Sequence, residues 1–473
     1  MSSRPRRLWL LPLAVLVLVG PPPSVTVAAV LAAVAIELTV RLRQALADVG
    51  AVERAAAAAG PQLPLGVDPG GRQVTLSDQA LSAHALILGA SGAGKSTTLL
   101  TVLGEHIRRG GPAIAIDLKG SPSFAAAIER ACAEAGRPLR CWTPDGTDHW
   151  NPLAHGNPTE LKDKLICTER FTEPHYQRAA ERYLQTVMQV LEAAHPDRPP
   201  VLGEVVAALD SQRMRSLLEQ VPGPMAARVE DYLAGLGRDQ WSAVRGIATR
   251  LAIISESHTG IYLEPGPGRM LDLCDALTGR EVVLFSLNSS AYGRLASQLG
   301  TLAVQDLVTT VGHRLRDGGG PHALVALDEF SALGADNVVA LLARGREAGV
   351  SVLLATQELA DLDRAAPGLR DQVLGNTAVK IVHRQDVPSS ARVLSAMIGA
   401  ERVWEETRHT GQSILFGRRD TGRGTRREVE RPIVHPDEIE RLGTGQAVLL
   451  TKIPTAATTH VRITPPPARG AER

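Results

Sequence analysis

The residues with the clearest chemistry lie in one stretch, HALILGASGAGKSTT, at positions 84–98. An apolar run at 85–88 leads into Gly-Ala-Ser-Gly-Ala-Gly-Lys-Ser at 89–96, and an apolar helical pattern follows. This matches the G-x-x-x-x-G-K-[ST] phosphate-binding pattern, in the strand, turn and helix context that the pattern requires. We therefore expect a loop whose backbone N–H groups surround a phosphate.

The residue types in this loop predict how it binds. Glycines adopt backbone conformations that other residues resist, and the positive end of the following helix attracts anions. Lys95 would reach the β- and γ-phosphates, and the Ser96 hydroxyl would ligate Mg²⁺, so ATP and Mg²⁺ are the expected ligands. The expected nucleotide-binding residues are Gly89, Ala90, Ser91, Gly92, Ala93, Gly94, Lys95, Ser96 and Thr97.

A second apolar run, at 323–327, ends in Asp328 and Glu329. Such a pair is weak evidence alone, but with a phosphate loop upstream it is the expected partner. Asp328 is predicted to hold Mg²⁺ together with Ser96. Glu329 is predicted to orient and deprotonate the attacking water.

Two further groups are catalytic candidates. Gln357 follows the apolar run 350–355 and could sense the γ-phosphate or the water, or simply cap a helix. Arg344 and Arg346 could stabilise charge on a neighbouring subunit's nucleotide. Basic residues in the last turn of a helix also suit its dipole, and Arg346 is the better candidate of the two.

Strands alternate with helices through most of the chain, which predicts an α/β fold with a parallel sheet. The strand at 112–117 ends in Asp117-Leu-Lys119, a charged pair at the sheet edge where ligands bind, or a polar turn. From Thr159 to about Arg269 helical periodicity dominates, which predicts an inserted all-α domain. Strands are expected at 85–88, 112–117, 139–142, 281–287, 323–327, 350–355, 378–383 and 445–450.

The amino terminus is almost entirely apolar from Leu8 to Val40 and is broken by Gly-Pro-Pro-Pro-Ser at 20–24. Two short spans, Leu8–Val19 and Val25–Val40, flanked by arginines, predict a transmembrane helical hairpin with both ends in the cytoplasm. A single span and a cleaved signal peptide are the alternatives. The predicted organisation is a membrane anchor at 1–45, a nucleotide-binding domain at 46–155 and 271–463, an all-α domain at 156–270, and a disordered tail at 464–473.

The composition of the chain restricts the functions and sites that it could have. The 473 residues carry a formal net charge of +1, so DNA binding would need a local basic patch or a basic pore lining. The four cysteines are widely spaced, which indicates neither a zinc knuckle nor a disulfide framework. The arginine-rich segment 401–431 could contact phosphates or form a solvated hairpin.

The order of motifs resembles the TraD/TraG-type coupling proteins of conjugation and type IV secretion, within the FtsK/HerA class of P-loop ATPases. The resemblance is carried by HALILGASGAGKST, IDLKG, WNPL before the helical insertion, LVALDEFSALG, GREAGVSVLLATQ, NTAVKIV and LGTGQAVLL. It implies a RecA-like motor domain with an all-α domain, assembled as a hexameric ring at the inner membrane. Carried over by position, Gly94, Lys95 and Ser96 bind nucleotide, and Asp328 and Glu329 are the metal and catalytic carboxylates. Gln357 and Arg346 match the family's glutamine and arginine.

We therefore expect a multi-pass protein of the cytoplasmic membrane, with its ATPase domain in the cytoplasm, that moves DNA with a relaxase or other protein cargo and contacts channel proteins. The alternatives are an ATP-dependent receptor for protein substrates, a DNA translocase outside conjugation, and a scaffold that binds ATP only to assemble. The membrane hairpin departs from the family pattern because it has almost no extracytoplasmic loop.

Overall fold

The computed structural model describes residues 62–466 except 169–170, 172 and 414–416. These residues belong to one compact unit, Gln62–Arg473. The expected membrane anchor, and all but the first residues of the expected tail, lie outside the described residues. Within the described ranges, no helix combines the length and the apolar character needed to cross a membrane.

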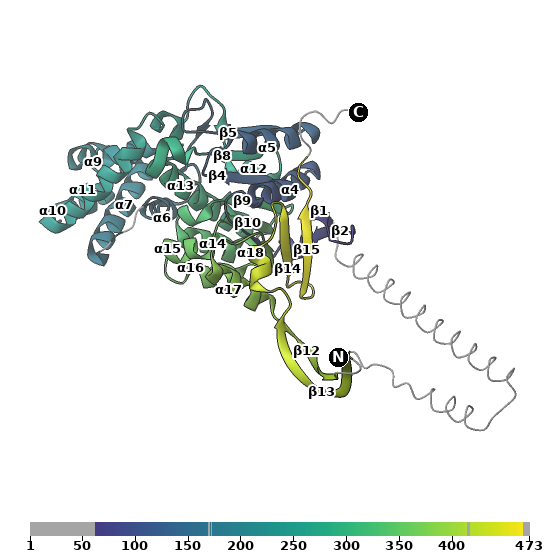
Figure 1. Ribbon diagram of the computed structural model, residues 1–473. Helices are drawn as coiled ribbons and strands as arrows, with labels where there is room; N and C mark the ends of the chain where they lie inside the picture. Colours follow the sequence, from purple (N-terminus) through teal and green to yellow (C-terminus); the bar gives the residue numbers. More distant parts are fainter. Residues whose placement is uncertain (1–61, 169–170, 172, 414–416, 467–473) are drawn as a thin grey trace. The chain divides into compact units, whose positions relative to one another are not determined.

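A parallel sheet forms the centre of the unit (Figure 1). Its strands neighbour one another in the order β11, β3, β10, β9, β4, β8, β5. Their bounds are β11 (Val379–Val382), β3 (Ala85–Leu88), β10 (Val350–Thr356), β9 (Ala323–Asp328), β4 (Ala113–Asp117), β8 (Val282–Ser286) and β5 (Leu139–Trp142). Beyond β11 the sheet continues antiparallel through β14 (Gln446–Thr451), β15 (Ala457–Ile463), β1 (Gln62–Val67) and β2 (Gln73–Ser77).

The central strands β3, β4, β8, β9 and β10 are buried on both faces, and their residues are mostly apolar. Within β3, Leu86 and Leu88 pack into one core, whereas Ala85 and Ile87 pack into the other. Helices α4 (Lys95–Arg108) and α5 (Pro122–Glu134) cover the face of Ala85 and Ile87. The opposite face is covered by α12 (Leu273–Thr278), α13 (Ser289–Arg316) and α14 (Ala335–Gly345). Helices on both faces of a parallel sheet are the expected solution for such strands.

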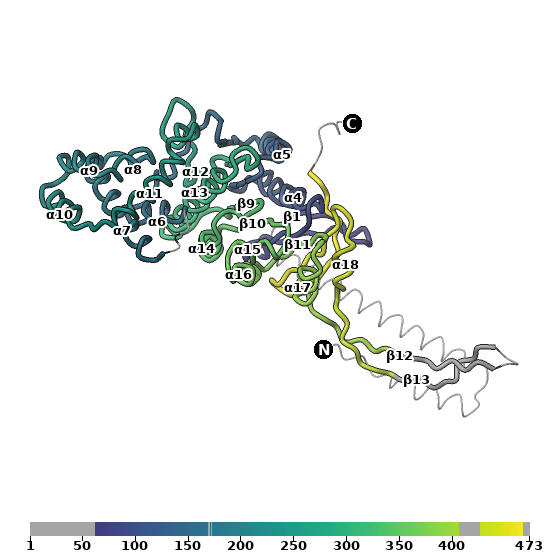
Figure 2. Tube along the Cα trace, turned by 60° about the vertical axis from the view of Figure 1, so that its left-hand side comes forward, coloured from purple at the N-terminus to yellow at the C-terminus, as the bar shows by residue number. Residues whose placement is uncertain are grey.

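A helical segment interrupts the alternation of strands and helices. It consists of α6 (Pro158–Ile166), α7 (Pro174–Ala194), α8 (Leu202–Ala208), α9 (Ser211–Leu218), α10 (Gly223–Ala234), α11 (Arg238–Ser255) and η1 (Gly260–Leu263). Figure 2 shows α7 to α11 grouped together at one end of the unit. The chain enters the segment through β6 (His149–Trp150) and leaves it through β7 (Met270–Leu271), and these two short strands pair in parallel. The segment is therefore anchored where its two ends meet.

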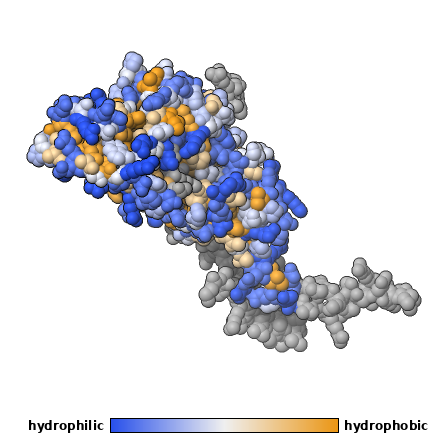
Figure 3. Space-filling view, turned by 90° about the vertical axis from the view of Figure 1, so that its left-hand side faces the viewer, coloured by the Kyte–Doolittle hydropathy of each residue, from blue (hydrophilic) through white to orange (hydrophobic). Residues whose placement is uncertain are grey.

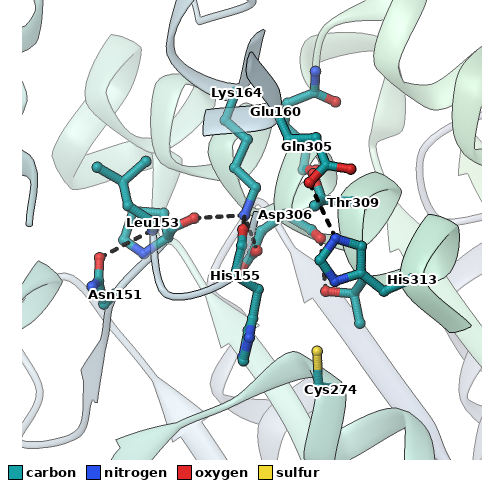
Figure 4. A network of polar contacts seen from close by, with 12 residues as sticks. Asn151, Leu153, His155, Glu160, Lys164, Cys274, Gln305, Asp306, Thr309 and His313 are labelled. Carbon is teal, nitrogen blue, oxygen red and sulfur yellow. Dashed lines mark hydrogen bonds and ion pairs between the residues drawn. The ribbon is translucent and has the colours of Figure 1, made fainter. Parts of the chain in front are cut away.

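A buried polar network at this anchor joins α6 to α13 (Figure 4). The Lys164 ammonium donates to the carbonyl oxygens of Pro152 at 2.9 Å and His155 at 2.7 Å, and lies 2.6 Å from Asp306 Oδ1. Trp150 Nε1 donates to Asp306 Oδ2 at 3.0 Å. The side chains of Lys164 and Asp306 are only 1% and 3% exposed, so each charge depends on the other for compensation.

The remaining elements follow β9 and β10. They are η2 (Phe330–Ala332), α15 (Leu359–Ala365), α16 (Leu369–Asn376), α17 (Pro388–Ile398) and α18 (Pro436–Glu440), with α3 (Asp78–Leu81) before β3. Strands β12 (Ala400–Ser413) and β13 (Gly417–Pro432) pair with each other and not with the large sheet. The arginine-rich segment is thus a two-stranded hairpin.

The first described strand lies in a stretch whose composition favours turns. Prolines and glycines at 60–71 predict turns, yet residues 62–67 form β1. Leu63 and Leu65 are 1% and 0% exposed and pack into the core, which outweighs the poor strand propensity of Pro64 and Gly66. The register shifts between Pro64 and Gly66, so the strand accommodates them with an irregularity.

Hydrophilic residues dominate the face of the molecule seen in Figure 3, with apolar residues in separate patches. Among the described residues, the large apolar side chains that are exposed are Val67, Ile253, Ile261, Met270, Leu315, Trp404 and Ile433.

Candidate nucleotide-binding site

The carboxyl ends of four neighbouring strands meet at one edge of the sheet. Leu88 of β3 lies opposite Thr356 of β10, and Ala355 of β10 lies opposite Asp328 of β9. Asp328 in turn lies opposite Asp117, the last residue of β4. The phosphate loop, the acidic pair and the Asp117 turn therefore all leave the sheet side by side, where ligands bind in such folds.

The loop at 89–94 turns sharply between β3 and α4. Gly92 and Gly94 have positive φ values of 72° and 117°, which glycine adopts without strain. Neighbouring segments fix the loop from outside: the Ala90 N–H donates to the Arg384 carbonyl at 2.8 Å, and the Gly445 N–H donates to the Ala93 carbonyl at 2.9 Å. The loop is thus built into the fold at both ends.

Lys95, the first residue of α4, is only 6% exposed. Its ammonium donates to two carbonyl oxygens of the loop itself, those of Gly89 at 2.6 Å and Ala90 at 3.2 Å. Burial lowers the pKa of Lys95, although the negative charges of Glu329 and Asp328 oppose this effect. A cation held inside a glycine-rich loop, at the start of a helix, is an arrangement suited to a phosphate.

Ser96 and Asp328 lie close together although they are 232 positions apart in the sequence. Ser96 Oγ lies 3.5 Å from Asp328 Oδ2, and Asp328 is 3% exposed. Burial raises the pKa of Asp328 to about 6, and the nearby charge of Glu329 adds to the shift. Hydroxyl and carboxylate oxygens are ligands that Mg²⁺ prefers, and a divalent cation would balance the buried carboxylate charge. The residues present therefore fit a magnesium ion.

Glu329 has a left-handed backbone, with φ 53° and ψ 41°, which is uncommon for a residue with a side chain. Its Oε1 accepts hydrogen bonds from Lys119 Nζ at 2.5 Å and from Gln357 Nε2 at 3.0 Å. Burial acts to lower the pKa of Lys119, but the hydrogen bond and charge of Glu329 outweigh it and the pKa is raised. The structure thus places the predicted Glu329 and Gln357 in direct contact and adds Lys119 to them.

Asp117 supports this contact without reaching it. Its two carboxylate oxygens accept from the backbone N–H groups of Lys119 at 3.0 Å and Ser121 at 2.7 Å. It is 1% exposed, and burial raises its pKa. The carboxylate therefore fixes the turn that presents Lys119 to Glu329.

Arg346 is not brought to this edge of the sheet. It is the exposed carboxyl cap of α14, and the chain then enters β10 at Val350, the end of the strand away from Thr356. It lines a cavity of about 490 Å³ together with Lys380 and Lys452. Arg346 therefore lies away from the phosphate loop of its own chain, and its predicted role toward a neighbouring subunit stays a prediction.

His383 was not anticipated from the sequence. It follows β11, is 0% exposed, and lies beneath the phosphate loop, where a Cβ added to Gly89 would lie 2.6 Å from the His383 Cβ. Nδ1 lies 2.9 Å from the Gln446 carbonyl oxygen, which can only accept, so Nδ1 carries the hydrogen and Nε2 accepts from the Thr98 hydroxyl at 2.8 Å. Burial lowers the pKa of His383 to about 4, which keeps the ring neutral. The only sequence signal was its place after an apolar run.

Residues 322–444 match the family model described as the TraM recognition site of TraD and TraG. Over this segment the chain is similar to TraD and TraG. The resemblance to TraD/TraG-type proteins is thus confirmed. Comparison of the sequence with curated proteins found no match.

Solved structures support the same fold. The unbound bacterial conjugative coupling protein TrwB matches with a TM-score of 0.60 and 16% identity over 85% of this chain and 88% of TrwB. TrwB in complex with ADP and Mg²⁺ matches with a TM-score of 0.59 and 16% identity over 86% and 90% of the two chains. VirB4 of Thermoanaerobacter pseudethanolicus matches with a TM-score of 0.54 and 14% identity over 86% and 97%. The predicted RecA-like α/β P-loop fold is therefore confirmed.

Proposed function

We propose that this protein is a membrane-anchored ATPase that couples ATP hydrolysis to the transfer of relaxase-bound DNA through a conjugative or type IV secretion system. The observation that carries the proposal is the meeting of Lys95, Asp328 and Glu329 at one sheet edge. Two findings support it: the TraD/TraG match at 322–444, and the likeness in fold to TrwB, whose structures include complexes with ADP and Mg²⁺ and with an ATP analogue.

The proposed roles follow from the contacts. Residues 89–97 form the nucleotide-binding loop, in which the N–H groups at the start of α4 and the Lys95 ammonium would hold the phosphates, while the Ala90 N–H, bonded to the Arg384 carbonyl, positions the loop. Ser96 and Asp328 would hold Mg²⁺. Bound there, Mg²⁺ would neutralise the charge that builds on the phosphates during hydrolysis. To accept a phosphate, Lys95 exchanges its bonds to the loop carbonyls for bonds to the ligand.

Glu329 is the proposed general base. Lys119 and Gln357 both bond its Oε1, so we assign Oε2 as the oxygen that takes the proton from the attacking water. The ammonium of Lys119 orients the carboxylate, and Gln357 lies where it could also hold the water. The strained backbone of Glu329 is consistent with a residue positioned for function.

The finer parts of the proposal concern assembly. We assign residues 1–45 as the membrane anchor, 46–155 and 271–463 as the nucleotide-binding domain, 156–270 as the all-α domain and 464–473 as a tail. A transmembrane hairpin would place the ATPase at the cytoplasmic face of the cell membrane. In a homo-hexameric ring, Arg346 would act on the nucleotide of the neighbouring subunit, which agrees with its exposed place at the opposite edge of the sheet.

The test is ATP hydrolysis by the purified full-length protein in detergent, with and without DNA, alongside plasmid transfer in cells. Lys95→Ala should abolish hydrolysis and transfer, because the buried ammonium is lost from the loop. DNA should stimulate hydrolysis by the unchanged protein. Transfer at the normal frequency by Lys95→Ala would overturn the proposal.

A second function is favoured by the family model itself, which is described as a TraM recognition site. The same ATPase could serve as a receptor for protein substrates, with residues 322–444 contacting a partner protein. In that case a protein cargo would stimulate hydrolysis and DNA would not.

A further inference from the structure

Three side chains of the kind that bind metal ions meet where the helical segment joins the rest of the unit. His155 comes shortly after β6, and Asp272 and Cys274 come directly after β7, so the three belong to the two ends of the segment. An imidazole nitrogen, a carboxylate oxygen and the cysteine sulfur lie within 4.8 Å of one another. We call these three residues the junction cluster.

Hydrogen bonds fix the backbone on both sides of the junction cluster. Asp272 caps the amino terminus of α12, where its Oδ1 accepts from the N–H groups of Cys274 at 2.7 Å and Asp275 at 3.2 Å. Its Oδ2 lies 2.7 Å from His155 Nε2. The His155 carbonyl oxygen accepts from the buried Lys164 ammonium at 2.7 Å, and Figure 4 shows His155 and Cys274 beside this network. The chain itself therefore brings the three ligand groups together.

The surroundings of the junction cluster admit a cation. The side chains of His155 and Asp272 are 31% and 35% exposed, and Cys274 is half-buried, so an ion can reach them from solvent. The neighbouring Lys164 ammonium lies 2.6 Å from Asp306 Oδ1, so its positive charge is compensated. A carboxylate, together with a thiol that loses its proton on binding, supplies the negative charge that a divalent metal requires.

The types of donor in the junction cluster select the metal. Imidazole nitrogen, thiolate sulfur and carboxylate oxygen are the ligands of Zn²⁺, whereas Mg²⁺ and Ca²⁺ prefer oxygen. Zinc–ligand bonds of about 2.0–2.3 Å place two ligands of a tetrahedral ion about 3.3–3.6 Å apart. Atoms that already lie within 4.8 Å of one another need to close by at most about 1.5 Å, which rotation of side chains can supply.

We propose that the junction cluster binds one Zn²⁺ through His155, Asp272 and Cys274, with water as the fourth ligand, and that the ion holds the two ends of the helical segment together. The ion takes the place of the hydrogen between His155 Nε2 and Asp272 Oδ2, and the Cys274 thiol releases its proton to solvent. Because 117 positions separate His155 from Asp272, ligand spacing in the sequence gives no sign of this site. None of the three ligands belongs to the proposed nucleotide site, so the inference does not depend on the proposed function.

The experiment uses the full-length protein without a histidine tag, in detergent, stripped of metal by a chelator and kept in excess Mg²⁺. Zn²⁺ binding is measured in competition with a chromophoric chelator, and Co²⁺ is then used in place of Zn²⁺. A bond between thiolate and Co²⁺ gives a charge-transfer absorption that oxygen and nitrogen ligands do not give. The variants are Cys274→Ser and His155→Gln. Cys167→Ser is the matched control, because Cys167 is an exposed free thiol outside the junction cluster.

The unchanged protein should bind one Zn²⁺ per chain, melt at a higher temperature with Zn²⁺ than without it, and show the thiolate–cobalt absorption. Cys274→Ser should lose this absorption. His155→Gln should weaken Zn²⁺ binding by more than about a hundredfold, since even partners outside the ligand shell contribute about 10- to 100-fold. Cys167→Ser should change neither property.

Absence of the thiolate–cobalt absorption from the unchanged protein would overturn the proposal whether or not the variants fold. Persistence of the absorption in Cys274→Ser, or its loss in Cys167→Ser, would show that another thiol binds the metal and would overturn it as well. An unchanged melting temperature with bound Zn²⁺ would refute the role of the ion in holding the segment. ATP hydrolysis enters none of these measurements, so their failure leaves the proposed function as it stands.

Discussion

Replacing Lys164 by methionine tests the network that anchors the helical segment. The substitution keeps the length of the side chain and removes its ammonium. Asp306, 3% exposed, then keeps the Trp150 indole N–H but loses its compensating charge. The carbonyl oxygens of Pro152 and His155 each lose a donor at the same time.

The expected magnitude follows from this burial. Removing one partner of a buried ion pair costs about 3–5 kcal/mol, because the remaining charge stays away from water without compensation. For the compact unit Gln62–Arg473, about 400 residues with an unfolding entropy of about 2.1 cal/mol/K each, every kcal/mol corresponds to roughly 1.2 °C in Tm. We therefore expect Lys164→Met to lower Tm by about 4–6 °C.

Thermal unfolding by calorimetry measures this shift. Lys162→Met is the control on the same helix, since Lys162 pairs with Asp163, whose side chain is 52% exposed, and such pairs contribute about 0–1 kcal/mol. Replacing both Lys164 and Asp306 by apolar residues should recover much of the loss, because no unpaired charge remains. Equal Tm values for Lys164→Met and Lys162→Met would refute the assignment of this pair as the anchor.

Two further predictions concern the nucleotide site. The folded-state pKa of Asp328, about 6, lies above the ordinary 3.8, so the stability of the folded protein falls as pH rises from about 4 to 6. Without Mg²⁺, Asp328→Asn should therefore raise the free energy of unfolding by about 3 kcal/mol at pH 8 and change it little near pH 4. Thermal melts at both pH values measure this difference. A Cβ on Gly89 would lie 2.6 Å from the His383 Cβ, so Gly89→Ala should weaken binding of a fluorescent ATP analogue at least about tenfold in an equilibrium titration. An unchanged Tm for Asp328→Asn at pH 8 would contradict the first prediction, and an unchanged affinity of Gly89→Ala for the ATP analogue would contradict the second.

The core of the site could be predicted from the sequence because its signals are local. A strand, a glycine-rich turn and a helix follow one another within fifteen residues, and the apolar run before Asp328 ends at the acids themselves. A parallel sheet brings the carboxyl ends of its strands to one edge, which places Gln357 at the same edge as Glu329.

The contacts made across the fold could not be predicted in this way. Lys119 and Glu329 are 210 positions apart, and their contact depends on β4 lying beside β9, an order that strand periodicity does not specify. The burial of His383 and of the Lys164–Asp306 pair could not be predicted for the same reason, since the burial of a polar residue is evident only when its neighbours in the fold are known. Strand β1 was missed because two leucines entering the core outweigh a proline and a glycine.

The central claim is that Lys95 binds the phosphates of ATP and that Glu329 activates the water that hydrolyses it. The most direct measurement follows labelled ATP bound to Glu329→Gln, Lys95→Ala and unchanged protein in the presence of Mg²⁺. The account predicts that Glu329→Gln retains ATP uncleaved, that Lys95→Ala binds almost none, and that the unchanged protein releases ADP. Release of ADP by Glu329→Gln at the unchanged rate would contradict it.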